Sequence, residues 1–119
     1  MENELKIPQT TLDLKNCFEN EGFVIDTCKQ MSKDLVGLVN DRVDFDIDLN
    51  ENVLNQITTT LIQVLNQMPN QNLQQFIYKV DLKEADFLKL IGDENKKEEL
   101  AFKIIKREAQ KIYLRRYFR

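Results

Sequence analysis

Residues 96–117 read KKEELAFKIIKREAQKIYLRRY, and their spacing points to a helical protein. At about 100° per residue, apolar side chains gather on one face of this stretch and polar side chains on the other. The apolar face holds Ala101, Phe102, Ile105, Ala109, Ile112 and Tyr113, and the opposite face holds Lys103, Lys106, Arg107, Gln110 and Lys111. We therefore predict a basic amphipathic helix over 96–117 with its apolar face in a core.

The same end of the chain concentrates positive charge. Residues 96–119 hold nine Lys and Arg against three Glu, whereas residues 1–95 hold eight bases against seventeen acids, and the whole chain carries −3. Bases near a helix C-terminus suit the negative end of the helix dipole, which explains part of the excess. The remainder indicates either an internal clamp or a docking surface for something anionic.

A second, narrower apolar line formed by Leu100, Leu114 and Phe118 lies near the basic side of this helix. An apolar line flanked by bases suggests that the helix contacts two neighbours. The predicted partner-binding residues are Arg107, Lys111, Leu114, Arg115, Arg116 and Phe118. The expected partner is an acidic protein surface or a second copy, and the chain's own Asp44, Asp46 and Asp48 are a further counterpart for these bases.

Nucleic-acid binding is the alternative function for the same helix. Tyr113, Tyr117 and Phe118 interleave with Arg115 and Arg116, a pattern that suits base stacking and phosphate contacts. Dedicated nucleic-acid binders are usually basic overall, and this chain is acidic. We therefore expect a small non-enzymatic interaction or adaptor protein first and a nucleic-acid-binding accessory protein second.

Helical patterns also cover most of the rest of the chain. We predict helices over 12–20, 26–40, 50–67 and 82–91, with Thr10 or Thr11 as the first cap and Gly22 and Gly92 as stops. Asp81 and Glu84 form a capping box for the helix over 82–91. With three Gly and two Pro, the chain has few turn residues for an antiparallel β fold.

The expected fold class is mostly α, a compact single-domain bundle of five to six helices over 12–119 after a flexible arm over 1–11. The core candidates are Phe18, Leu35, Leu38, Leu54, Ile57, Leu61, Leu65, Phe76, Ile77, Phe87, Leu88, Ile91, Phe102, Ile105 and Ile112. The alternative is an α+β fold with a two-stranded sheet over 43–49 and 76–82. Residues 43–49 alternate apolar side chains with aspartates, the signature of a half-buried strand, and 76–82 fits either a helix or a strand.

Several chemistries are excluded by residue content. The chain has no histidine, which removes the imidazole base, the His-paired nucleophiles and His-ligated zinc. Cys17 and Cys28 lie eleven residues apart, so they form no CxxC motif, and we expect two reduced, buried thiols. We predict no enzymatic activity, no cofactor and no metal site.

Asp44, Asp46 and Asp48 are spaced like the start of a calcium loop. Such a loop needs Gly at its sixth position and Glu at its twelfth, and these positions hold Leu49 and Asn55. We expect an acidic, solvated edge, with weak Mg²⁺ or Ca²⁺ binding as the sharper hypothesis.

The first residues are acidic and polar, without the basic region and apolar run of a secretory signal. No apolar run approaches the roughly 20 residues that a bilayer-spanning helix needs. We therefore expect a cytoplasmic protein with no membrane span.

Overall fold

The computed structural model describes residues 6–90 and 93–118, apart from the side chains of Glu84 and Asp86, and all its regular structure is helical. Its elements are α1 (Thr11–Cys17), α2 (Glu21–Leu35), α3 (Val53–Gln67), α4 (Asn70–Val80), α5 (Glu84–Leu88), the 3₁₀ turn η1 (Glu94–Lys96) and α6 (Lys97–Tyr117). The prediction of a mostly α, compact bundle is confirmed. No helix in the described part of the chain is long and apolar enough to cross a membrane.

Side-chain caps define the N-termini of α1, α2 and α3. Thr10 caps α1 in a capping box, in which the Asp13 amide donates to Thr10 Oγ1 at 3.1 Å and the Thr10 amide donates to Asp13 Oδ2 at 3.2 Å. Asn20 and Asn52 cap α2 and α3 by accepting a backbone amide hydrogen on Oδ1. Each cap satisfies a donor that would otherwise have no partner within the helix.

The expected stop at Gly22 is wrong. Asn20 accepts from the Phe23 amide at 2.9 Å, so α2 begins at Glu21 and Gly22 lies in its first turn. The helix also ends earlier than expected, at Leu35, and Gly37 then turns the chain with a φ of +82°. A glycine therefore does end this segment, but it is Gly37, whose backbone occupies the left-handed region that favours glycine.

The two-stranded sheet does not form. Residues 42–48 run extended without strand pairing, and 76–80 belong to α4. Leu73, Phe76, Ile77 and Val80 are all buried on one face of α4, so helical burial decides between the two interpretations of this segment. Residues 36–52, here called the connector, link α2 to α3.

The segment after α4 differs from the prediction. Asp81 is the C-cap of α4, with a left-handed φ of 71°, and α5 covers only Glu84–Leu88. Leu88 was predicted to be in the core but is 56% exposed. Ile91, Gly92 and the side chain of Glu84, which the predictions also used, lie outside the described residues.

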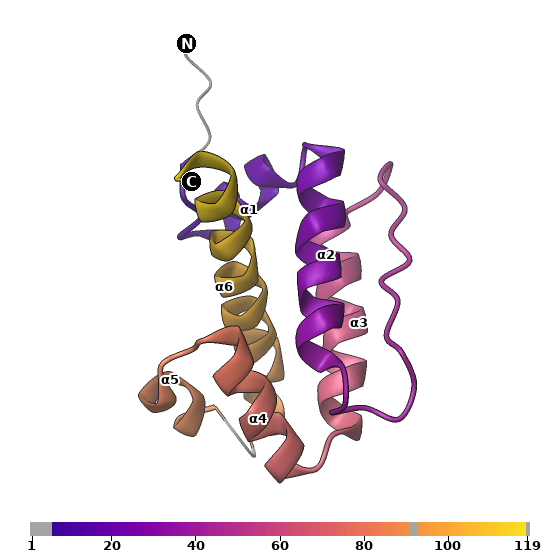
Figure 1. Cartoon of the computed structure of the whole chain (residues 1–119), viewed down its shortest axis with the longest axis vertical. Coiled ribbons are helices and arrows are strands. Elements are labelled where there is room, and N and C mark those ends of the chain that lie inside the picture. The colour runs from indigo at the N-terminus through magenta and orange to yellow at the C-terminus, as the bar shows by residue number, and fades with distance from the viewer. Residues whose placement is uncertain (1–5, 91–92, 119) are drawn as a thin grey trace.

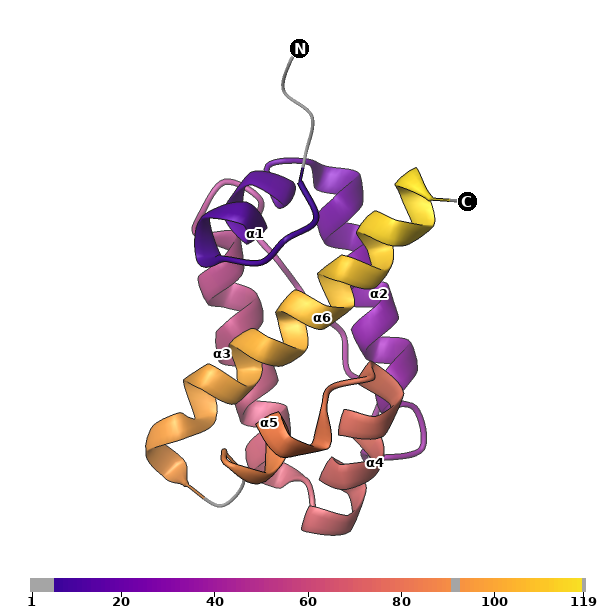
Figure 2. The same cartoon turned by 90° about the vertical axis from the view of Figure 1, so that its left-hand side faces the viewer.

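Helix α6 packs against α2, α3 and α4 (Figure 1). Figure 2 shows it crossing α2 and α3 obliquely, with its C-terminal end beside the first turns of α2. Its buried side chains are Leu100, Ala101, Ile104, Ile105, Glu108, Ala109 and Ile112. Among the other core candidates with described side chains, Phe102 is half-buried against the core and Leu88 is exposed, and the rest are buried. One core therefore forms around α6.

Residues 6–10 precede α1 and lie against α6. Pro8 is buried, and its carbonyl oxygen accepts from Gln110 Nε2 at 2.8 Å. Residues 1–5 of the predicted arm lie outside the described part of the chain. The contact at Pro8 brings the start of the described chain next to the C-terminal half of α6, where the predicted site residues lie.

Candidate functional site

All six predicted partner-binding residues belong to the C-terminal half of α6 or to the residue that follows it. Arg107 is the first of them, and it reaches the turn after α4. Its guanidinium Nη2 lies 2.9 Å from Asp81 Oδ2, and Nε donates to the Asp81 carbonyl oxygen at 3.3 Å. This hydrogen bond lowers the pKa of the Asp81 carboxyl below its usual value. Arg107 therefore anchors α6 to the left-handed residue that ends α4.

Lys111 lies at the centre of a buried charge cluster. Its Nζ is 3.1 Å from Asp34 Oδ2 on α2 and 2.8 Å from Glu108 Oε1 on the preceding turn of α6, and it donates to the Lys79 carbonyl oxygen at 2.9 Å. The Lys111 and Asp34 side chains are mostly buried, and Glu108 is fully buried. This lysine joins α2, α4 and α6 at one point.

Glu108 is the most perturbed acid described in the chain. Burial, with a contribution from the neighbouring Asp34 carboxyl, raises the pKa of Glu108 to about 8. Although Oε1 lies close to Lys111, neither Glu108 oxygen has a well-aligned hydrogen-bond donor among the described residues. At neutral pH this carboxyl is therefore mostly protonated.

Sequence reasoning missed Glu108, although the signal was present. Glu108 lies three residues after Ile105 and four before Ile112, on the buried face of the helix. An acid at that spacing must be buried when its apolar neighbours are. The predicted apolar face was correct for Ala101, Ile105, Ala109 and Ile112. It omitted Ile104 and Glu108, and Leu100, predicted on a second line near the basic side, is buried in the core.

Two arginines connect the last turns of α6 to α2. Arg115 Nη2 donates to Gln30 Oε1 at 2.7 Å, and Gln30 Nε2 donates to Asp34 Oδ1 at 3.1 Å. Arg116 Nη2 lies 2.9 Å from Asp26 Oδ2, and its guanidinium lies 5.2 Å from the centroid of the Phe23 ring. These contacts extend the buried cluster towards the N-terminal half of α2.

The four predicted bases therefore form an internal clamp, which consists of Arg107, Lys111, Arg115 and Arg116 with their partners. The expected intramolecular counterpart, the strip of Asp44, Asp46 and Asp48, is wrong. Asp26, Asp34 and Asp81 supply the carboxylates, whereas Asp44 pairs with Arg42 at 3.0 Å on the exposed connector. Because α2 and α4 pack against α6, their acids lie within ion-pair distance of these bases.

The two predicted apolar residues remain in contact with solvent. Leu114 is 37% exposed and Phe118 is 69% exposed, and Tyr117 beside them is 53% exposed. The Tyr113 ring centroid lies 4.8 Å from that of Tyr117 and 6.2 Å from that of Phe118. We call Leu114, Tyr117 and Phe118 the terminal patch, which the sequence predicted without Tyr117.

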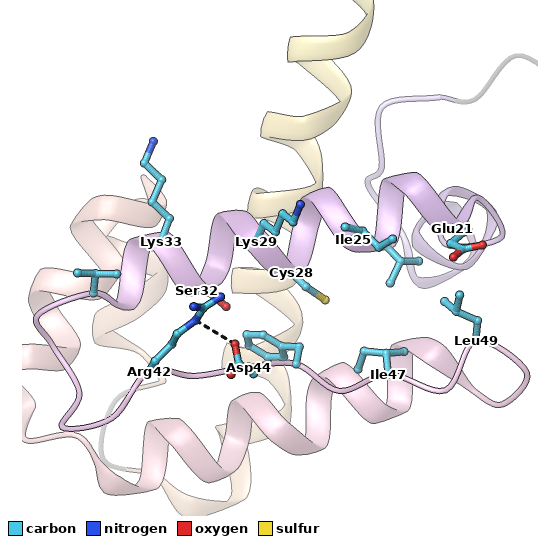
Figure 3. A pocket seen from close by; sticks show the side chains of 13 residues that line it. Glu21, Ile25, Cys28, Lys29, Ser32, Lys33, Arg42, Asp44, Ile47 and Leu49 are labelled. Atoms are coloured by element: carbon cyan, nitrogen blue, oxygen red, sulfur yellow. Dashed lines mark ion pairs between the residues drawn. The ribbon is translucent and has the colours of Figure 1, made fainter.

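A second feature, not predicted, is a groove of about 750 Å³ between α2 and the connector (Figure 3). Ile25 and Cys28 line it from α2, and Phe45, Ile47 and Leu49 line it from the connector. Burial raises the pKa of Cys28 to about 12 and that of Cys17 to about 11, so both thiols are protonated at neutral pH. The predicted free, buried cysteines are confirmed.

Asp44, Asp46 and Asp48 project from the connector as exposed side chains. Within the described ranges, no three His, Cys, Asp or Glu side chains come together as a group that could hold a metal ion. The hypothesis of weak cation binding therefore gains no geometric support from these three residues.

Comparisons of this chain with protein-family models, with curated proteins and with solved structures give no significant match. Its function is therefore inferred from its own contacts, chiefly the internal clamp, the terminal patch and the groove.

Proposed function

We propose that this protein is a non-enzymatic interaction module that docks an acidic partner protein through the terminal patch of α6. The observation that carries the proposal is the exposure of Leu114, Tyr117 and Phe118 within five consecutive residues. A cluster of apolar side chains kept in water is unfavourable unless something covers it, and aromatic residues are enriched in protein interfaces. A protein surface is the natural cover for such a patch.

The charge next to the patch supports an acidic partner. Arg115 and Arg116 flank it, and residues 96–119 carry a large excess of bases. Charges at the rim of an interface guide association and exclude partners of like charge more than they add affinity. Arg107 and Lys111 are engaged with Asp81, Asp34 and Glu108, and Arg116 pairs with Asp26, so the proposal assigns these bases first to the fold and leaves docking to the terminal patch.

We propose no enzymatic role because histidine is missing and the cysteines and Glu108 are buried. The sequence contains no histidine, and both thiols are buried with a raised pKa. Glu108, the acid with the most perturbed pKa, lies in packed protein and lines none of the described pockets. Cys28 lines the groove, but its raised pKa keeps the thiol protonated at neutral pH, and Cys17 and Glu108 line none of the described pockets.

Nucleic acid is the less favoured ligand for the same surface. Three of the four bases of the clamp already face carboxylates of their own chain. A phosphate backbone would have to displace those carboxylates or bind beside them, and the repulsion would reduce the gain from counterion release. The aromatic rings suit a protein interface as well as they suit base stacking.

The test compares proteins captured from native cells by the wild type and by the double variant Tyr117→Ala/Phe118→Ala, with nuclease added to half of each sample. Tyr78→Ala is the matched control, because Tyr78 is 86% exposed on α4, far from the patch in sequence. We expect a nuclease-resistant acidic protein that the control retains and the double variant loses at least about tenfold. Equal capture by the wild type and the double variant would refute the proposal.

The same preparation separates the other possible occupants. Sedimentation of the purified protein at increasing concentration reports self-association, and a dimer that the double variant abolishes would replace the acidic partner with a second copy. Retention on heparin that falls steeply with salt and needs Tyr117 and Phe118 would favour nucleic acid instead.

A further inference from the structure

The main chain of the connector has unused hydrogen-bonding groups. Val43 accepts from the Ser32 hydroxyl at 2.8 Å through its carbonyl oxygen, and the Asp48 amide and carbonyl bond to the side-chain amide of Gln56 at 2.8 Å each. Between these two anchors, no described residue hydrogen-bonds to the main chain of 44–47. An extended segment held at both ends and unpaired between them resembles the edge strand of a sheet.

Side-chain burial along this segment has the period of a strand. Val43, Phe45 and Ile47 are half-buried against the core, and Asp44, Asp46 and Asp48 are exposed. In extended backbone, the N–H and C=O groups of alternate residues point to the same edge. Because the Val43 carbonyl points to Ser32 on α2, the backbone groups of Phe45 and Ile47 are expected on the edge that faces α2.

The groove lies beside that edge and has the dimensions of an extended peptide. Residues 21–36 of its α2 wall span about 22 Å at 1.5 Å per residue. Residues 42–49 on the opposite wall span about 23 Å at 3.3 Å per residue. The two walls run side by side over this length (Figure 3), which matches an extended segment of about six or seven residues.

We propose that residues 43–48 are a docking edge to which a partner protein adds an extended segment of alternating apolar and basic side chains, lying in the groove beside α2. This mode of binding takes its affinity from main-chain hydrogen bonds and its specificity from alternate side chains. The apolar side chains of the segment would contact Ile25, Cys28, Phe45 and Ile47. Its other side chains would lie next to the three exposed aspartates.

Charge complementarity favours the basic side chains. Residues opposite each other on paired strands are stabilising when their charges differ and destabilising when they are alike. The connector already holds one guanidinium in this way, since Arg42 Nε lies 3.0 Å from Asp44 Oδ1. Of the three bases that line the groove, Arg42 is paired with Asp44, Lys33 points away from the connector (Figure 3), and Lys29 lies on the α2 wall.

The same argument disfavours a second copy of residues 43–48 as the occupant. Two such segments paired with each other would bring aspartates against aspartates on the exposed face. The proposed site is also separate from the terminal patch, because none of the groove-lining residues belongs to α6. Loss of function at one surface therefore leaves the other unaffected.

The test titrates the full-length protein with a blocked seven-residue peptide that alternates valine and lysine, and follows backbone amide exchange. We expect slower exchange and chemical-shift changes at 44–47, with saturable binding. Two control peptides have the same length, one with glutamate in place of lysine and one with alternate amide nitrogens methylated to block pairing. Both should bind at least about tenfold more weakly.

Variants of the protein locate the site. Asp46→Lys should weaken binding of the lysine peptide about tenfold and strengthen binding of the glutamate peptide, whereas Glu51→Lys, an exposed reversal beyond the edge, should leave both unchanged. Tyr117→Ala/Phe118→Ala should bind the lysine peptide like the wild type. No protection at 44–47, equal binding of the methylated peptide, or protection that rises with protein concentration alone would each overturn the proposal.

Discussion

The C-terminal half of α6 and residues 42–48 of the connector both mix apolar and charged residues closely, yet the fold uses them in opposite ways. In α6 the charged side chains turn inward and meet acids of α2 and α4. In the connector the aspartates face solvent, and the only ion pair described there is the exposed one between Arg42 and Asp44.

The difference follows from how each backbone satisfies its hydrogen bonds. A helix pairs its own N–H and C=O groups, so α6 can pack against three helices and commit its side chains to them. An extended segment has no internal pairs and keeps its backbone available to another strand. Charge on the helix therefore contributes to stability, whereas charge on the connector is available for recognition.

The largest expected effect on stability is at Lys111, in the buried charge cluster of α6. Lys111→Met removes the cation between Asp34 and Glu108, and loss of one partner from a buried pair typically costs about 3–5 kcal/mol. Urea unfolding measures the change, with Lys15→Met, an exposed lysine of α1 without a described ion pair, as control. A variant as stable as that control would show that the clamp does not hold α6 in place.

The second effect is a pH dependence from Glu108. Its pKa is raised to about 8 in the folded protein, above its ordinary value of 4.5 in the unfolded chain. Its contribution to stability is therefore full below about pH 4.5 and is lost as the pH rises through about 8. The free energy of unfolding of Glu108→Gln, relative to that of the wild type, should therefore rise by at most about 1.4 kcal/mol per pH unit between pH 5 and 8.

Thermal and urea unfolding over that pH range check the slope. Glu99→Gln, which removes an exposed acid of the same helix, is the control and should follow the wild-type curve. If Glu108→Gln also runs parallel to the wild type, the carboxyl is ionised in the folded protein and the argument from burial is wrong.

A smaller effect is expected where the clamp reaches the surface. The pair of Arg116 with Asp26 is partly exposed, and such pairs contribute about 0.2–1 kcal/mol. A double-mutant cycle with Arg116→Met and Asp26→Asn isolates this coupling energy. A coupling as large as the effect at Lys111 would mean that buried and exposed ends of the clamp do not differ.

The smallest effect on stability belongs to the connector. Asp46→Asn changes an exposed side chain with no described contact, so the free energy of unfolding should move by less than about 0.5 kcal/mol. Urea unfolding of the free protein checks this. A larger loss would give the aspartates a role in folding and weaken the contrast with α6.

Much of the fold follows from local patterns. The buried stripe of α3, the threonine cap at Thr10 and the presence of an apolar face on α6 were readable from spacing, because helical periodicity and burial agree there. Spacing did not decide whether residues 76–82 form a helix or a strand, because their side chains fit both periods and no local feature distinguishes the two structures. Burial of Phe76 and Ile77 together on one helix face settles the question.

The candidate site divides in the same way. The presence of bases and apolar residues at the end of α6 is a property of the sequence, and so is the alternation of Val43, Phe45 and Ile47 with aspartates. Which acid faces which base depends on the placement of α2 and α4 against α6, since these partners lie 26 to 90 residues apart in the chain. Ion pairs act over a few ångströms of space, so sequence spacing cannot assign them once the chain has folded back on itself.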